Sequence, residues 1–598
     1  MREFSVPAKV TVAKEANLTD AVFDNAAQHP EAVAFRRKVD GDWKPVTTAE
    51  FADQVRSLAK GLVARGVQPG DRVGLLSKTR YEWTLADYAI WTAGAVTVPI
   101  YETSSPEQVA WILGDSGAVA VIVETPLHKG VVEQVRGELA ELKELYVIEA
   151  GGIDELVGAG KDVSDDDIEQ RRRSLDTESL ATVIYTSGTT GRPKGCELTH
   201  GNFVFDATTT TEGLSHLFRE DASTLVFIPL AHVFARIIQV GCVINRVTLG
   251  HSADVKNLLA DLAVFQPTFL LSVPRIFEKV YNGAVAKTRE EGGAKAKIFA
   301  AAEKVAISYS EALQRGSVPP HLKLAHAAFD KLVYAKLRGL LGGKVDYAVS
   351  GGAPLGARLG HFFRGVGVTI LEGYGLTETT AGATCNLPDA IKVGTVGRPI
   401  PGATVKIADD GEILLRGDNI FRGYWKNEKA TSEVLEGDGF FHTGDIGELD
   451  DDGFLTITGR KKELIVTAGG KNVAPAVLED RLRSHPLISQ CIVVGDNKPF
   501  IACLVTIDPE ALPQWRRENG KPESAQVEDL VDDSDLRNEI QKAVDEANKA
   551  GSRAEAIRKF RILKVDFTEE GGQMTPTLKL KRNVVMKDFS SEVESLYS

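Results

Sequence analysis

A loop rich in glycine and threonine, TSGTTGRPKG at residues 186–195, has the composition of a segment that binds phosphate groups. Its three glycines let backbone amides approach a ligand closely, while its hydroxyl groups and Lys194 supply hydrogen-bond donors. The loop departs from the GxxxxGK[ST] pattern of Walker A, because Pro193 occupies the position of the second glycine. We interpret it as a flexible phosphate cradle, with an exposed turn between two elements as the alternative.

Regular elements must hold this loop in place, and the sequence predicts an α/β fold for them. Short apolar segments at residues 72–78, 96–101 and 118–124 alternate with amphipathic stretches. This alternation predicts a mainly parallel, doubly wound sheet with helices between its strands. The loop follows another apolar segment, residues 181–186, and the polar stretch 162–179 before it is predicted to be a solvated connector.

The second half of the chain changes in character along its length. Residues 284–341 favour helices, and the strands predicted at 344–350 and 368–375 both end in glycines. From about residue 411, short strands with turn residues predict a β-rich subdomain. From about residue 466, a helix followed by two strands, a helix and a strand predicts a smaller α+β domain.

Composition limits the class of protein. The 598 residues include 70 Lys and Arg against 83 Asp and Glu, and the resulting net charge of −13 argues against general nucleic-acid binding. The five cysteines have no CxxC spacing, which excludes a disulfide framework and an ordinary zinc motif. Because the sequence has no signal-peptide pattern and no apolar run of about 20 residues, we expect a soluble, cytoplasmic protein.

A series of segments resembles the motifs of the adenylate-forming enzymes, the superfamily of acyl-CoA synthetases, luciferases and nonribosomal adenylation domains. In chain order they are the loop at 186–195, SGGAP at 350–354, EGYGLTET at 372–379, HTGDIG at 442–447, GRKKELIVTAGGKNVAP at 459–475 and MTPTLKLKR at 574–582. Two more segments, PLAHVFAR at 229–236 and SVPRIFEKVY at 272–281, are most similar to the long-chain fatty acyl-CoA synthetases. The resemblance covers nearly the whole chain.

The resemblance implies an enzyme that joins a long-chain fatty acid to coenzyme A in two steps. The carboxylate of the acid first attacks the α-phosphate of ATP and releases pyrophosphate, and the thiol of coenzyme A then attacks the acyl-adenylate. Because the first step brings an anion to a polyanion, neutralisation of charge must dominate catalysis. Mg²⁺ as the cofactor, Lys194, the loop amides and a second lysine would supply the positive charge.

The resemblance also implies which residues bind the nucleotide. Tyr374 would stack on adenine, Asp445 would accept hydrogen bonds from both ribose hydroxyls, and Arg460 would meet the ribose or a phosphate. Glu372 occupies a position where many relatives carry Gln. The nucleotide-binding set is Thr186, Ser187, Gly188, Thr189, Thr190, Gly191, Lys194, Gly351, Gly352, Ala353, Glu372, Gly373, Tyr374, Gly375, Thr377, Asp445 and Arg460.

The resemblance implies three catalytic residues, Lys579, Glu378 and Lys194. Glu378 and Thr186 are the candidate Mg²⁺ ligands, because this ion prefers oxygen ligands and keeps several from phosphate and water. The alternative for Glu378 is a surface side chain at a helix start, stabilised by the helix dipole. Lys579 is the candidate adenylation lysine, but its segment lacks the glycine of the common PxTxxGK pattern, so Lys581 competes for the role.

The resemblance places His232 and Phe234 beside the carboxylate end of the acyl pocket. The alternative for His232 is a core position, since a lone histidine in an apolar segment is more often buried there than functional. A general base is not needed, because a fatty carboxylate is already ionised at neutral pH.

We expect residues 1–459 to form a large domain that binds ATP and the acyl group, and residues 463–598 to form a small mobile domain with the catalytic lysine. A lysine inserted at the adenylate would obstruct the incoming thiol. The resemblance therefore implies that the small domain rotates about a hinge at residues 460–462, with Lys462 as the hinge residue.

Two other functions stay open at this point. A fatty acyl-AMP ligase would pass its adenylate to a carrier protein, and thioester formation with free coenzyme A separates it from the first hypothesis. A catalytically silent homologue would only bind an acyl group or a nucleotide, and the presence of Lys194, Glu378, Asp445, Arg460 and a late lysine argues against it. Contact with a membrane surface and a homodimer are both compatible with the resemblance.

Overall fold

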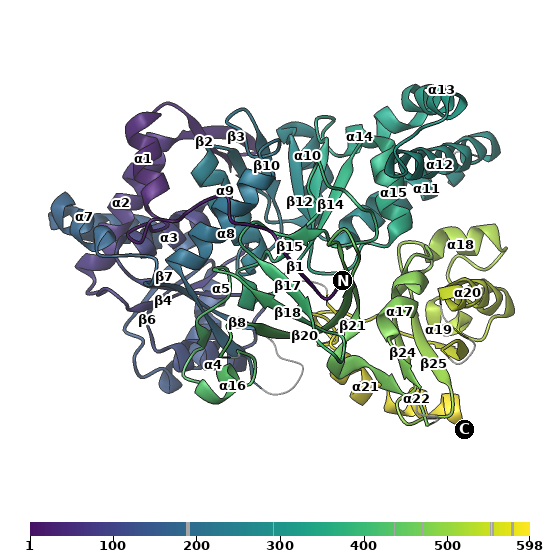
Figure 1. The fold of residues 1–598 in the computed structure, drawn as a ribbon. Helices are drawn as coiled ribbons and strands as arrows, with labels where there is room; N and C mark the ends of the chain where they lie inside the picture. The colour runs from purple at the N-terminus through teal and green to yellow at the C-terminus, as the bar shows by residue number, and fades with distance from the viewer. Residues whose placement is uncertain are drawn as a thin grey trace.

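Figure 1 shows the computed structural model, in which a large body lies beside a smaller part formed by the C-terminal residues. Helices and sheets are mixed throughout the body, so the predicted α/β fold class is confirmed. The structure describes residues 1–598 except 187–191, 291, 436, 469–470, 551, 553–554 and 576–578.

The predicted doubly wound sheet is a seven-stranded sheet in the first part of the body. Its strands are β4 (Arg72–Leu76), β5 (Val96–Ile100), β6 (Ala118–Val123), β7 (Glu144–Val147), β8 (Leu180–Thr186), β9 (Lys194–Thr199) and β19 (Gly423–Tyr424). Their spatial order is β19-β9-β8-β5-β4-β6-β7, and the strands from β8 to β7 are parallel. The apolar strands are buried because helices such as α3 (Tyr81–Thr92) and α4 (Pro106–Ser116) cover the sheet.

The loop predicted to bind phosphate, residues 186–195, joins β8 to β9, which are antiparallel neighbours. Thr186 and Lys194 are register partners and therefore face each other where the hairpin leaves the sheet. The predicted contacts of Ser187, Gly188, Thr189, Thr190 and Gly191 lie outside the described residues.

Two further sheets complete the α/β region of the body. One has the order β10-β11-β2-β3 and the other β12-β13-β14-β15-β16. The first contains β2 (Val33–Val39), β3 (Asp42–Thr47), β10 (Ser223–Val226) and β11 (Thr248–His251); the second contains β12 (Phe269–Ser272), β13 (Tyr347–Ser350), β14 (Thr369–Tyr374), β15 (Thr384–Cys385) and β16 (Arg398–Pro399). Strands β12, β13 and β14 are parallel, so the glycines predicted after β13 and at the end of β14 come to one edge of the sheet.

Helices pack around these sheets, and some of them make up the predicted helical region at residues 284–341. They include α8 (His200–Gly213), α9 (Val233–Asn245), α11 (Pro274–Glu290), α12 (Gly293–Gln314), α13 (Pro320–Phe329) and α15 (Ala357–Val366). In Figure 1, α11, α12 and α13 lie together at the end of the body above the C-terminal part.

The predicted β-rich subdomain is an antiparallel sheet with the order β1-β17-β18-β20-β21. Its strands are β1 (Glu3–Ser5), β17 (Thr404–Ile407), β18 (Glu412–Arg416), β20 (Phe441–Leu449) and β21 (Leu455–Arg460). The pairing of β20 with β21 places Asp445 opposite Arg460. Backbone pairing alone therefore places two candidate nucleotide-binding residues side by side.

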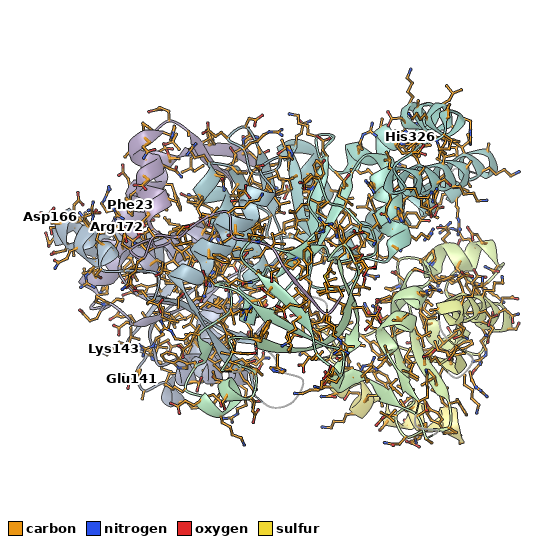
Figure 2. The ribbon with its side chains drawn as sticks, in the orientation of Figure 1. Phe23, Glu141, Lys143, Asp166, Arg172 and His326 are labelled. Carbon is orange, nitrogen blue, oxygen red and sulfur yellow. The ribbon has the colours of Figure 1, made fainter. Side chains whose placement is uncertain are left out.

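The predicted solvated connector before the phosphate loop is wrong in part, because it contains helix α7 (Asp165–Arg173). The hydroxyl of Ser164 caps this helix, and acidic residues in its first turn and basic residues in its last turn match the helix dipole. Arg172 is buried, and its guanidinium lies 4.7 Å from the centre of the ring of Phe23 in α1 (Asp20–Gln28). Figure 2 labels the two side chains beside each other. A charge run that looked solvated therefore anchors a helix to the body.

The C-terminal part contains the predicted succession of helix, two strands, helix and strand around a three-stranded sheet, but its described residues form three α-helices where one was predicted and two more after the last strand. The elements are α17 (Pro475–Arg483), β24 (Ile488–Val494), β25 (Ile501–Ile507), α18 (Leu512–Glu518), α19 (Val527–Leu530), α20 (Ser534–Ala547), β26 (Ile557–Ile562), α21 (Arg582–Asp588) and α22 (Ser590–Tyr597). Buried apolar side chains on the two faces of the sheet form separate clusters, one including Trp515 and the other Phe567. These clusters are distinct from the main core of the body.

All five cysteines are buried free thiols. Within the part of the chain that the structure describes, no helix is both long and apolar enough to cross a membrane.

Candidate functional site

A cleft of about 2200 Å³ is lined by residues of the body and of the C-terminal part. Residues from all the motif segments singled out in the sequence, except SVPRIFEKVY, meet there. The predicted site residues that line it are Thr186, Lys194, His232, Phe234, Gly351, Gly352, Gly373, Tyr374, Gly375, Thr377, Glu378, Asp445, Arg460, Lys462 and Lys579. Ala353 and Glu372 are described but do not line the cleft, and Glu372 instead accepts a hydrogen bond from the Leu355 amide at 3.2 Å.

Tyr374, Asp445 and Arg460 form one polar network in the cleft. The Tyr374 hydroxyl donates to Oδ2 of Asp445 at 2.6 Å, and Nε of Arg460 lies 3.0 Å from Oδ1. Burial, followed by the charge of Asp445, raises the pKa of Tyr374 well above its ordinary value, so the phenol keeps its proton. Both oxygens of the Asp445 carboxylate are therefore oriented before any ligand arrives.

Glycines keep backbone and side chains close together at the wall of the cleft. A Cβ atom at Gly375 would lie 1.7 Å from the carbonyl oxygen of Ala381, so only glycine fits at this position. A Cβ atom at Gly351 would lie 3.2 Å from Cζ of Phe234. The SGGAP segment and the PLAHVFAR segment are therefore in direct contact across the cleft wall.

Tyr424, which the sequence analysis missed, links Glu378 to Lys194. Its hydroxyl donates to Oε1 of Glu378 at 2.8 Å, and Nζ of Lys194 lies 4.8 Å from the centre of its ring. Nothing in the local sequence FRGYWKN, residues 421–427, indicates that its tyrosine belongs to a functional site. Tyr424 reaches the site only because β19 pairs with β9, which places this residue opposite Cys196.

The side chains of Thr186 and Glu378 both lie beside the Cys196 thiol. The buried Cys196 thiol interacts with both of them. Burial, followed by the charge of Glu378, raises the pKa of this thiol well above its ordinary value. The thiol therefore stays protonated, which makes it a poor nucleophile.

Lys579 enters the cleft from the C-terminal part. Its Cε atom would lie 3.9 Å from a Cβ atom placed on Gly352, so the side chain passes over the SGGAP segment. Burial, followed by the positive charge of Arg460, lowers the pKa of Lys579, while the charges of Asp445 and Glu378 oppose this shift. Lys579 therefore lies within electrostatic reach of the nucleotide motifs.

Lys581, the competing lysine, also lines the cleft. Its backbone amide donates to the carbonyl of Gln573 at 2.7 Å, just before α21 begins. Because both lysines reach the cleft wall, the choice between them stays a prediction.

His232 lies immediately before α9 and is uncharged at neutral pH. Its Nδ1 atom accepts a hydrogen bond from the backbone amide of Phe234 at 3.2 Å. Burial, followed by the positive charge of Lys579, lowers the pKa of His232 to about 3. Beyond it, Ile237 and Ile238 of α9 continue the lining as an apolar wall.

Lys462 lies in a short helical turn, Lys461–Glu463, that follows β21. The residue before it is held to the body, since Nζ of Lys461 lies 2.5 Å from Asp410 and 3.0 Å from Glu412. Glu412, a residue that the sequence analysis missed, also accepts a hydrogen bond from the Gly444 amide at 2.9 Å. It therefore joins the HTGDIG segment to the chain that leads into the C-terminal part.

Comparisons with known proteins agree over the whole chain. A model of the AMP-binding enzyme family matches residues 22–425, and a model of the AMP-binding enzyme C-terminal domain matches residues 462–598. The chain is 54% identical over 601 residues to long-chain-fatty-acid–CoA ligase FadD15 of Mycobacterium bovis, and the alignment covers all of both proteins. It is 32% identical to long-chain-fatty-acid–CoA ligase ACSBG2 of Xenopus laevis over 95% of this chain and 82% of that protein.

A solved structure has the same fold. O-succinylbenzoate coenzyme A synthetase from Bacillus subtilis, in complex with ATP and a magnesium ion, superposes with a TM-score of 0.67 at 22% identity. The match covers 94% of this chain and 98% of that one.

Proposed function

Because this chain belongs to the AMP-binding enzyme family, we propose that it joins a long-chain fatty acid to coenzyme A at the expense of ATP. The observation that carries the proposal is that Lys579 of the C-terminal part lies among the nucleotide motifs of the body in one cleft. The choice of acid rests on the Mycobacterium bovis relative, which bears the name of a long-chain-fatty-acid–CoA ligase and matches along its full length.

In the first proposed step, a carboxylate oxygen of the acid bonds to the α-phosphorus of ATP. The bond from that phosphorus to the bridging oxygen breaks, and pyrophosphate leaves with the electron pair. Tyr374 and Asp445 would hold adenosine, while Arg460 and Lys579 would offset the negative charge that grows on the phosphoryl oxygens. The neutral imidazole of His232 would border the acyl end without taking a proton.

The donor set around Glu378 fits Mg²⁺. Among the described residues, no group of three or more His, Cys, Asp and Glu side chains is arranged to hold a metal ion. The Glu378 carboxylate and the Thr186 hydroxyl are oxygen donors that both lie beside the Cys196 thiol, and so small a protein donor set suits an ion that keeps most of its ligands from phosphate and water. When bound there, Mg²⁺ would neutralise phosphate charge.

In the second proposed step, the sulfur of coenzyme A bonds to the acyl carbon. The bond from that carbon to the phosphate oxygen breaks, AMP leaves with the electron pair, and the thiol proton passes to solvent. Lys579 lines the cleft in which the acyl-adenylate would lie, and a lysine there would obstruct the incoming thiol, so we propose that the C-terminal part rotates about Lys462 between the two steps.

The proposal is tested by incubating the protein with ATP, Mg²⁺ and saturated acids of graded chain length, with and without coenzyme A. We expect release of pyrophosphate that depends on a long-chain acid, and acyl-CoA as the product when coenzyme A is present. Adenylate that reacts only with an acyl carrier protein would show the alternative ligase. The absence of pyrophosphate release with every acid would refute adenylation itself.

A further inference from the structure

Helix α11 of the body is linked to the C-terminal part by ion pairs. All three body residues of these pairs lie on α11, and their partners lie between the end of β25 and the end of α18. The pairs are Arg275–Asp508, Lys279–Glu510 and Glu290–Arg517, with N–O distances of 3.3, 3.3 and 2.8 Å. The helix begins within the SVPRIFEKVY segment, for which the proposed chemistry supplies no role.

The pair formed by Arg275 and Asp508 is the most shielded of the three. The side chains of Arg275 and Asp508 are 20% and 13% exposed, whereas those of Lys279 and Glu510 are 49% and 75% exposed. Exposed ion pairs contribute little because water and salt screen them. The electrostatic link between the two parts therefore depends mainly on Arg275.

Asp508 is oriented toward Arg275 before the two parts meet. Its Oδ1 atom accepts a hydrogen bond from the backbone amide of Glu510 at 2.8 Å, which leaves Oδ2 for Arg275. The same guanidinium lies 3.3 Å from Oε2 of Glu278. The negative charge of Glu278 in turn helps to raise the pKa of Asp480 on α17, after burial as the main cause. Without Arg275, Glu278 of the body and Asp508 of the C-terminal part would lose the guanidinium that both of them contact.

Packing beside these pairs is incomplete. A second cavity, of about 480 Å³, is lined by Tyr281 and Phe299 of the body and by His485 and Ala543 of the C-terminal part. A cavity of this size means that apolar contact does not close the interface here. An interface of this kind depends on charge and can separate without exposing a large core.

We propose that Arg275 is a positioning residue for the adenylation step, because its pairing with Asp508 holds the C-terminal part where Lys579 enters the cleft. The inference rests on the proposed function and gives the SVPRIFEKVY segment a role in it. Arg275 is not among the described residues that line the substrate cleft, and it would act through the placement of Lys579. Its loss should therefore affect one half-reaction and not the other.

The test is a double-mutant cycle with Arg275→Gln, Asp508→Asn and the double variant. Asn keeps an oxygen for the Glu510 amide but removes the charge, so the local turn is preserved. We expect each single variant to lower the rate of ATP–pyrophosphate exchange about tenfold. The double variant should exchange no more slowly than the less active of the two single variants. The rate of thioester formation from supplied acyl-adenylate should stay within about twofold of wild type.

The matched control is Lys498→Gln, which removes a charge from the 2.9 Å pair between Lys498 and Glu594, both in the C-terminal part. Its exchange rate should equal that of wild type. The inference is overturned if Arg275→Gln exchanges at the wild-type rate, if both half-reactions fall equally, or if the effects of the two single variants multiply in the double variant.

A distance measurement tests the inference without relying on activity. The five native thiols are buried, so spin labels can be attached at introduced cysteines replacing the exposed Leu324 in the body and Val565 in the C-terminal part. We expect Arg275→Gln, but not Lys498→Gln, to broaden or shift the distance distribution. Unchanged distances would contradict the inference. If the wild type exchanged no pyrophosphate while the distances still responded to Arg275→Gln, only the proposed function would fail.

Discussion

Hydroxyl groups orient both carboxylates that the proposed mechanism uses. The phenol of Tyr374 bonds Asp445, and the phenol of Tyr424 bonds Glu378. A carboxylate that is already oriented needs little reorganisation when a ligand binds, which favours catalysis. Each tyrosine therefore holds a carboxylate in a fixed orientation, in addition to any contact that the tyrosine itself makes with the nucleotide.

Replacing Tyr424 with Phe tests this role for Glu378. The ring beneath Lys194 would remain, but the 2.8 Å hydrogen bond to Glu378 would be lost. We expect the Mg²⁺ concentration needed for half-maximal adenylation to rise about tenfold, as is typical when a partner of a metal ligand is removed. Tyr146→Phe, which breaks a 2.7 Å bond to Glu144 away from the cleft, is the matched control. An unchanged Mg²⁺ requirement in Tyr424→Phe would contradict the role assigned to its hydroxyl.

Glu372 gives a prediction for stability against pH. Burial, reinforced by the charge of Asp480, raises the pKa of Glu372 from 4.5 to about 7, although the Leu355 amide opposes this. The folded state thus binds a proton that the unfolded state releases, so this group makes stability fall as the pH rises from 4.5 to 7.

Glu372→Gln removes that penalty while keeping an oxygen for the Leu355 amide. We expect the variant to exceed wild type in free energy of unfolding by about 2–3 kcal/mol at pH 8, and by much less at pH 5. Thermal or urea unfolding at the two pH values measures this difference. The same gain at both pH values would show that charge on Glu372 is not its source.

At the scale of elements, backbone pairing places the functional side chains. The β8–β9 hairpin sets Thr186 opposite Lys194, and the pairing of β20 with β21 sets Asp445 opposite Arg460. The chain then leaves β21 through a short turn whose first residue, Lys461, is held to the body by Asp410 and Glu412. Any rotation of the C-terminal part would therefore begin after Lys461.

Lys462→Pro tests this turn as the hinge. The backbone angle φ that proline imposes is compatible with the helical turn Lys461–Glu463, so the observed orientation should be retained. We expect adenylation to stay within about threefold of wild type and thioester formation from supplied acyl-adenylate to fall at least about tenfold. Lys462→Ala, which leaves φ free, should affect neither step. Equal losses of both half-reactions in Lys462→Pro would defeat the hinge assignment.

The sequence predicted elements whose signals are local. The apolar runs that became β13 and β14, and the glycines that follow or end them, were identified because period and composition are visible in a short window. Tyr424 and Glu412 were missed because their roles arise from strand pairing between distant segments. Helix α7 was missed because its charged residues hide a capped helix whose Arg172 packs on another helix.

At the scale of the whole molecule, a net charge of −13 conceals a cleft with several cations. Lys194 and Arg460 come from the body and Lys579 from the C-terminal part, and all three line the same cleft. The positive charge that would meet a triphosphate in this cleft therefore comes from both parts of the chain. The predicted homodimer and membrane contact lie outside this arrangement and stay predictions.

The central claim is that the C-terminal part completes the adenylation site, and Lys579→Ala tests it most directly. Loss of one donor that stabilises the transition state commonly lowers the rate about 10²–10³-fold, and we expect this loss in ATP–pyrophosphate exchange. Thioester formation from supplied acyl-adenylate should persist, and Lys581→Ala should retain both activities. Wild-type exchange in Lys579→Ala, with the loss appearing in Lys581→Ala instead, would contradict the assignment.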